Sequence, residues 1–278
     1  MILLTVLIAT LVIAISLPVL GQRVLERRIV FVDLALAQVA ATGYAMGMAL
    51  QIPGVYAAAA TTSIALVLMA LMDEDTPLPK EAVMGAVYAF AASVGMVMLS
   101  LLPYGEGQLM GLLFGSVLGI DWDGIIRLAV FSGLGLLLAL PEHSNTFTGR
   151  LRFYSGLSLI IVPAIYAIGV LLVFAYLVMP ALSVWRRGHN GPTWQALTLA
   201  VIASTVGTFI ADFLDLPPSA TVVLTLAFIA VVTGLIIYFI DRNSDHEEEL
   251  EEDDEEDDDD EEDDEDEDQQ EPAAERAS

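Results

Sequence analysis

Two polar side chains, Asp33 and Gln38, lie inside the apolar stretch Phe31–Ala41 (FVDLALAQVAA). Carboxylate and amide oxygens are ligands that hard and borderline divalent cations prefer. An ionisable residue at the centre of a lipid-embedded helix costs about 2.5 kcal/mol or more, so it usually has a partner or lines a pathway. The segment therefore predicts an ion path. The structural alternatives are an ion pair of Asp33 with Arg27 or Arg28 and an interhelical hydrogen bond from Gln38.

A second pair of carboxylates, Asp212 and Asp215, lies just before the dipeptide Pro217–Pro218. Proline cannot continue a helix, so the pair marks a turn between two apolar segments. Carboxylates at such a turn are suited to receive a divalent cation. Capping of helices, or simple exposure to water, is the structural alternative.

The elements that must position these residues are membrane-spanning helices. The chain has 278 residues, 56% of them hydrophobic, and a mean hydropathy of +0.67, which is typical of a polytopic membrane protein. A span needs about 20 apolar residues. The sequence predicts an all-α bundle of eight or nine spans, at 2–21, 29–50, 54–72, 82–102, 124–140, 153–168, 170–185, 194–212 and 219–240.

Basic residues orient this array, because lysine and arginine concentrate in cytoplasmic loops. We place the first basic cluster, Arg23/Arg27/Arg28, on the cytoplasmic side. The segment 107–120 then dips without crossing, and 153–185 crosses twice around Gly169. Every other basic cluster also falls inside: Arg150/Arg152, Arg186/Arg187 and Arg242. The alternative, a single crossing by each of these two segments, would place 141–152 outside. The preferred arrangement predicts an outside N-terminus and a cytoplasmic C-terminus.

The charge of −26 belongs mainly to the end of the chain. Residues 241–278 contain 25 acidic and 2 basic side chains, and 247–268 are acidic except for Leu250. Such a block repels itself and is typical of disorder. We therefore predict a transmembrane domain at 1–242 and a disordered acidic cytoplasmic tail at 243–278. The tail is interpreted as a solvated spacer or as a weak store of divalent cations.

Several kinds of chemistry are excluded by composition. The chain has no cysteine and three histidines, which excludes disulfides, thiolate sites and a multi-histidine metal cage within one chain. A P-loop requires a Gly-Lys pair, and the single lysine, Lys80, follows a proline. The chain therefore does not hydrolyse ATP itself. We expect membrane lipid around it and no nucleic-acid partner.

Five motifs in order carry a family resemblance: Arg27–Gly43, Glu81–Tyr88, Leu113–Ile120, Gly169–Pro180 and Asp215–Leu224. Together they resemble the zinc/manganese-type ABC transporter permeases, the membrane subunits of bacterial metal importers. The resemblance covers roughly residues 20–240. It implies a homodimeric permease in a bacterial inner membrane, with a separate ATP-binding subunit and an extracytoplasmic metal-binding protein.

The transported substrate that the resemblance implies is a divalent ion, zinc, manganese or iron, and no covalently bound cofactor is expected. The metal path would involve Asp33, Gln38, Asp212 and Asp215 along a dimer interface. Members of the family also dock their ATPase through a cytoplasmic helix, which would lie after residue 140 in this chain. The corresponding segment here is the short Pro141–Arg152, in which Glu142, Thr146, Gly149 and Arg150 are assigned to ATPase coupling.

The chain departs from the family pattern at the first motif. The family's Asp and its His four residues later align with Leu34 and Gln38, and Asp33 lies one residue early. Asp33 and Gln38 are about 140° apart around a helix, so they do not share a face. Ser219 also stands where the closing motif usually has glycine. Two other hypotheses therefore stay open: a non-transporting homologue that acts as a membrane scaffold, and a carrier driven by an ion gradient.

Overall fold

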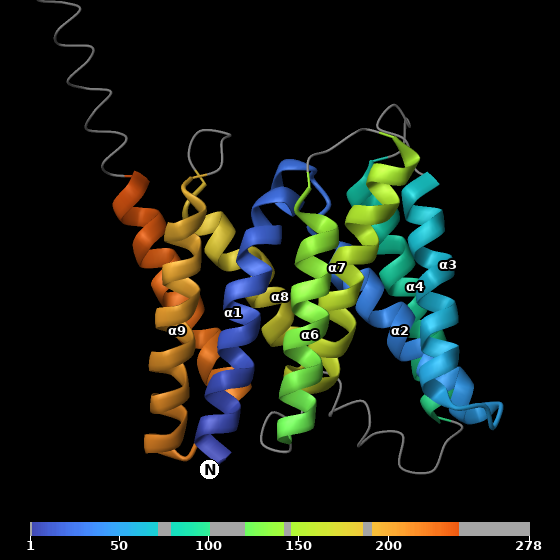
Figure 1. Cartoon of the computed structure of the whole chain (residues 1–278), viewed down its shortest axis with the longest axis horizontal. Helices are drawn as coiled ribbons and strands as arrows, with labels where there is room; N and C mark the ends of the chain where they lie inside the picture. Colours follow the sequence, from blue (N-terminus) through green and yellow to red (C-terminus); the bar gives the residue numbers. More distant parts are fainter. Residues whose placement is uncertain (1, 72–78, 101–119, 142–145, 186–190, 239–278) are drawn as a thin grey trace, which may run out of the picture. The chain divides into compact units, whose positions relative to one another are not determined.

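The computed structural model describes residues 2–71, 79–100, 120–141, 146–185 and 191–238, and every regular element in these ranges is a helix. They confirm the predicted all-α fold (Figure 1). The helices are α1 (Ile2–Glu26), α2 (Val32–Ala49), α3 (Gly54–Leu71), α4 (Lys80–Ser100), α6 (Trp122–Ala139), α7 (Phe147–Ile168), α8 (Val170–Ser183), α9 (Thr193–Leu214) and a last helix, Pro218–Tyr238.

Each of the nine predicted spans overlaps one of these helices. Seven are long and apolar enough to cross a membrane; the exceptions are α2 and the 14-residue α8. The predicted break inside 153–185 falls at Gly169, whose φ of 89° separates α7 from α8. Glycine has no Cβ and adopts this conformation without strain. The predicted dip at 107–120 lies outside the described residues, except for Ile120.

The chain divides into two units, 1–234 and 235–278. The first contains α1 to α9 and most of the last helix. In the second, the structure describes residues 235–238. The predicted acidic tail at 243–278 therefore lies outside the described residues, as do Arg186, Arg187 and Arg242.

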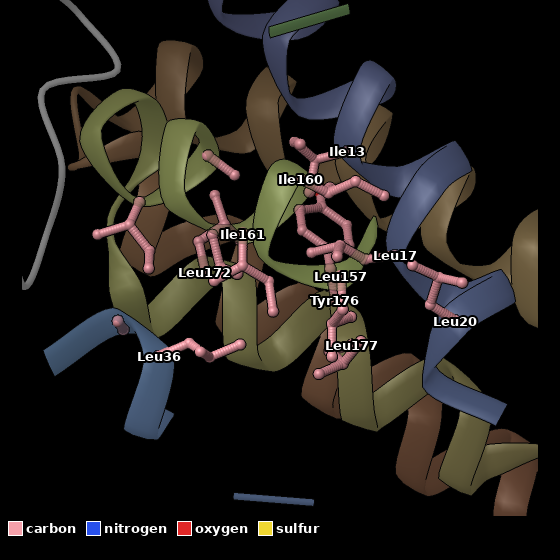
Figure 2. Packing of buried hydrophobic residues seen from close by; sticks show 14 of the residues in the cluster. Ile13, Leu17, Leu20, Leu36, Leu157, Ile160, Ile161, Leu172, Tyr176 and Leu177 are labelled. Atoms are coloured by element: carbon pink, nitrogen blue, oxygen red, sulfur yellow. The ribbon is translucent and has the colours of Figure 1, made fainter. Parts of the chain in front are cut away.

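The core of the first unit forms where α1, α7 and α8 pack together. Figure 2 shows buried aliphatic side chains of these helices around the ring of Tyr176. In lipid, such packing stabilises the association of helices through van der Waals contacts and a few hydrogen bonds. The Tyr176 hydroxyl is hydrogen-bonded to Ser204 Oγ, which donates in turn to Ala200 O (2.7 Å). Thus α8 is joined to α9 inside an otherwise apolar core.

Close packing of α6 on α7 depends on two facing glycines. A Cβ built on Gly156 would lie 2.6 Å from Gly135 O and 2.8 Å from Ala139 N, both backbone atoms that cannot move aside. A Cβ built on Gly135 would lie 2.6 Å from Gly156 O. These two helices can therefore approach only where neither carries a side chain.

We expect Gly135→Ala to lower the free energy of unfolding by about 1–3 kcal/mol, the usual penalty for overpacking. Gly133, on the same helix, is the matched control, because nothing lies within 4 Å of a Cβ built there. Gly133→Ala is expected to stabilise slightly, since alanine is the better helix former by about 1 kcal/mol. Thermal unfolding of the two purified variants in detergent measures both effects. Equal stability of the two variants would contradict the packing argument.

Basic residues gather at one end of the helices of the first unit, called here the arginine end. Hydrogen bonds connect helix termini across it. Arg23 Nη1 donates to Ala139 O (2.7 Å), Arg150 Nε to Ala70 O (3.0 Å) and Arg152 Nη2 to Pro141 O (3.1 Å). The end of α1, the end of α3, the end of α6 and the start of α7 therefore lie together, at the top of Figure 1.

Candidate metal path

The turn between α1 and α2 leads directly to Asp33. Arg28 has a φ of 53°, its N–H donates to Leu25 O (3.0 Å), and the N–H of Ile29 donates to Val24 O (3.1 Å). This pair of bonds is the Schellman motif, which satisfies the last carbonyls of a helix. Val24 and Ile29, buried at 0% and 1% exposure, are its apolar pair. The turn is therefore a defined corner, and α2 begins three residues later.

Asp33 lies in the first turn of α2 and is buried, with 2% of its surface exposed. Its Oδ1 has no hydrogen-bond partner among the described residues. Arg27, one of the expected ion-pair partners, has its guanidinium carbon 4.3 Å from the centroid of the Phe153 ring, and Arg28 is exposed. An unpaired buried polar atom costs about 1–3 kcal/mol and calls for an explanation. Asp33 is therefore the residue of this chain whose burial points most directly to function.

Leu34 and Gln38, the positions that align with the family's Asp and His, lie on one face of α2. They are four residues apart on a continuous helix, and both are half-buried in the single chain. Residues at this spacing are neighbours on the helix surface, with Cβ atoms about 5–6 Å apart. Asp33 lies on a different face. The structure thus places an aliphatic group and an amide as neighbours on this face of α2.

Asp212 and Asp215 lie at the far end of α9 and are exposed. Asp215 has a φ of 53° where α9 ends, and the N–H of Leu216 donates to Ala211 O (2.9 Å). Aspartate adopts the left-handed conformation more readily than most residues, so Asp215 has a structural reason for its place. Asp215 is exposed, so its carboxylate can contact water or ions.

The four predicted path residues do not form one ligand set in a single chain. Gln22 Nε2 donates to Gly191 O (2.8 Å), so α9 starts at the arginine end, near the start of α2. From there α9 runs to Leu214, and Asp212, in its last turn, lies about 30 Å from the start of the helix. Asp33 and the Asp212/Asp215 pair therefore lie at opposite ends of the helices. Among the described residues, no group of three His, Cys, Asp or Glu is placed to hold a metal ion.

Three of the four predicted coupling residues are described, and Glu142 lies outside the described residues. Thr146 caps α7, since its Oγ1 accepts a hydrogen bond from Gly149 N (3.3 Å). Arg150 Nε reaches the last turn of α3. The exposed residues Thr146 to Thr148 form the start of α7 at the arginine end. This short surface is available to a partner at that end.

Sequence reasoning missed the role of Gln22 and used Arg23 only for orientation. Gln22 is buried at 4% exposure, and its side chain binds Gly191 O and the Thr193 hydroxyl, 2.7 Å away. A glutamine within the 25-residue apolar helix α1 was the available signal. Its partners are more than 160 residues away in the chain. Local pattern could not identify them.

These helices define a multi-pass inner-membrane protein. Its buried acid, Asp33, lies close to the arginine end. The sequence matches the ABC 3 transport family over residues 1–237. The chain therefore belongs to that family, the membrane subunits of ABC transporters.

The chain is similar to two relatives in sequence and to one solved structure in fold. It is 26% identical to the manganese transport system membrane protein MntB of Synechocystis sp., over 72% of each chain. It is 24% identical to the high-affinity zinc uptake system membrane protein ZnuB of Buchnera aphidicola, over 79% of this chain and 92% of the relative. PsaBC from Streptococcus pneumoniae, solved in complex with Fab, has the same fold, with a TM-score of 0.63 at 18% identity over 84% of this chain and 90% of that one.

Proposed function

We propose that the chain is the permease subunit of an ATP-driven importer of a divalent metal ion: manganese, zinc or iron. The observation that carries the proposal is the family match across the helical domain, together with the buried Asp33, whose Oδ1 has no hydrogen-bond partner among the described residues. The named relatives transport manganese and zinc. A buried carboxylate with one unpaired oxygen is suited to receive a cation in passing, because the ion compensates its charge while it is present.

Charge asymmetry supports an orientation with the arginine end in the cytoplasm. Six described basic residues lie there: Arg23, Arg27, Arg28, Lys80, Arg150 and Arg152. One, Arg127, lies near the opposite end. The opposite end carries the exposed carboxylates of Asp121, Asp123, Asp212 and Asp215. Cytoplasmic loops are rich in basic residues, and carboxylates on the outer side raise the local concentration of cations. The acidic tail would then be cytoplasmic.

In this proposal Asp212 and Asp215 receive the ion at the outer mouth. Gln38 offers an oxygen along the path, and Asp33 lies near its cytoplasmic end. The half-buried face of Leu34 and Gln38 would meet its copy across a homodimer, so that two chains complete the path. An extracytoplasmic metal-binding protein delivers the ion.

The energy comes from a separate ATP-binding subunit docked at the arginine end. Glu142, Thr146, Gly149 and Arg150 are its proposed coupling residues. Support comes from the exposed start of α7 and from the bond of Arg150 to Ala70 O, which passes a displacement of α7 to α3. ATP binding then drives alternation between outward and inward access.

Reconstitution tests the proposal. The chain is combined in proteoliposomes with a candidate ATPase and binding protein, and uptake of manganese, zinc and iron is measured with and without ATP. ATP-dependent uptake of at least one ion is expected. Uptake that is abolished by uncouplers but indifferent to ATP would instead establish a carrier driven by an ion gradient. No uptake of any of the three ions would leave the scaffold hypothesis, which the Leu34/Gln38 departure favours.

We expect Asp212→Asn combined with Asp215→Asn to raise the KM for metal uptake several-fold while kcat changes little. Asparagine tolerates the left-handed conformation at 215, so the helix end is preserved and only charge is lost. The effect should shrink at high salt, which screens exposed charges beyond about 10 Å. Initial uptake rates at several metal concentrations and two ionic strengths measure it. An unchanged KM would assign both aspartates to structure alone.

A further inference from the structure

Side chains at the end of α1 and directly after it contact three other helices, α6, α7 and α9. Gln22 Nε2 donates to Gly191 O, and its Oε1 accepts from Thr193 Oγ1, at the start of α9. Arg23 Nη1 donates to the carbonyl of Ala139, the last residue of α6. That carbonyl is one of four at a helix end without a donor inside the helix, and a cation there is favourable.

A second arginine, Arg27, directly follows the last residue of α1 and contacts α7. The Arg27 guanidinium lies over the ring of Phe153, which is buried at 2% exposure in the second turn of α7. Such a cation–π contact contributes about 0.5–2 kcal/mol, more when water is excluded. The end of α6 is thus bound to α1 through Ala139, and the second turn of α7 contacts the turn after α1 through Phe153.

The same turn of α1 is rigidly connected to the start of α2. The Schellman motif fixes Arg28 and Ile29, and the N–H of Val32 donates to Ile29 O (3.0 Å). Asp33 follows immediately. The end of α6 and the second turn of α7 are therefore connected to Asp33 through two arginine contacts and one short capped turn.

We propose that Arg23 and Arg27 are positioning residues that transmit movement of the end of α6 and the start of α7 to the start of α2, so that ATPase action changes the surroundings of Asp33. This inference rests on the proposed function. Neither arginine needs to touch the ion or the ATPase. Their effect is on the number of ions moved per ATP hydrolysed, and not on ATP hydrolysis itself.

The first test is the ratio of metal uptake to ATP hydrolysis in proteoliposomes that contain the complete transporter. Arg27→Ala should lower the ratio at least tenfold, with ATPase binding retained and hydrolysis within about twofold of the wild type. Arg27→Lys should recover part of it, because lysine keeps the charge but not the planar stacking. Arg28→Ala is the matched control: it removes the same charge from the same turn at an exposed left-handed position.

The second test needs neither uptake nor the ATPase. The chain has no cysteine, so Phe31→Cys and Thr148→Cys, both at exposed sites, accept one spin label each. The distance distribution between the labels in the permease alone should be narrow in the wild type and in Arg28→Ala, and broad in Arg27→Ala. If Arg27→Ala does not fold, Arg23→Gln replaces it in both tests.

The outcomes separate the two proposals. Wild-type protein without ATP-dependent uptake overturns the proposed function, and the label distances still decide whether the contacts hold the two segments together. Wild-type uptake with an unchanged uptake-to-ATP ratio in Arg27→Ala overturns the inference alone. Loss of ATPase binding in Arg27→Ala also overturns it, since Arg27 would then be a docking residue. Equally narrow distributions in all variants would contradict the rigid connection.

Discussion

Replacing Asp33 with asparagine is expected to reduce metal uptake at least tenfold while raising the free energy of unfolding. The carboxylate is buried and one of its oxygens has no hydrogen-bond partner among the described residues. Burial of the ionisable group costs about 2.5 kcal/mol on insertion scales, and its place in the first turn of α2 returns only about 0.3–1 kcal/mol. The net gain on neutralisation is therefore roughly 1–2 kcal/mol. Uptake and thermal unfolding of the same preparation measure both effects.

Asp123→Asn is the control for this substitution. Asp123 is also in the first turn of its helix, α6, but is exposed. We expect it to change the free energy of unfolding by less than about 0.5 kcal/mol and uptake far less than Asp33→Asn does. Parallel loss of stability and uptake in Asp33→Asn would make Asp33 a structural residue. Full uptake together with raised stability would make it a bystander.

Combining Leu34→Asp with Gln38→His is expected to lower the dissociation constant for zinc or manganese at least tenfold. The two positions share a face of α2 at a spacing that brings side chains together. A carboxylate oxygen and an imidazole nitrogen can both reach a metal at about 2.0–2.2 Å. The change restores the ligand types that the family resemblance implies. Titration calorimetry of the purified permease with each metal measures it.

The metal-free double variant should be less stable, because Asp replaces Leu at a half-buried position in the membrane domain. Added metal should recover that stability, since a ligand that binds only the folded state stabilises it. The control combines Leu34→Asp with Val39→His, which puts the same groups about 140° apart on the helix. Equal affinity of the two double variants would show that the shared face has no role.

Much of the fold could be predicted residue by residue. The break at Gly169 followed from a run too long for one span with a glycine near its middle, and the structure has that break. The angular separation of Asp33 and Gln38 followed from helix geometry alone and holds in α2. These predictions worked because each depends on residues that are close in the chain, where backbone stereochemistry decides.

The candidate site could be predicted only in part. Asp33 was identified from its residue type and surroundings, but its unpaired oxygen depends on how other helices pack around it. An ion pair between Asp33 and Arg27 was a reasonable alternative, because the two residues are six positions apart in the chain. Instead Arg27 lies on Phe153, which is more than 120 residues away in the chain. Similarly, nothing near Arg23 in the sequence indicates Ala139 as its partner.

The sequence by itself determined the class of protein, the helix positions and the family. In lipid every backbone polar group must be satisfied within its own segment, so a run of about 20 apolar residues has little choice but to be a helix. Tertiary structure decided which polar side chains meet and which stay unpaired. Those contacts depend on close packing between helices far apart in the chain. It left Oδ1 of Asp33 without a hydrogen-bond partner among the described residues, and it placed the end of α6 and the second turn of α7 against the turn that leads to Asp33.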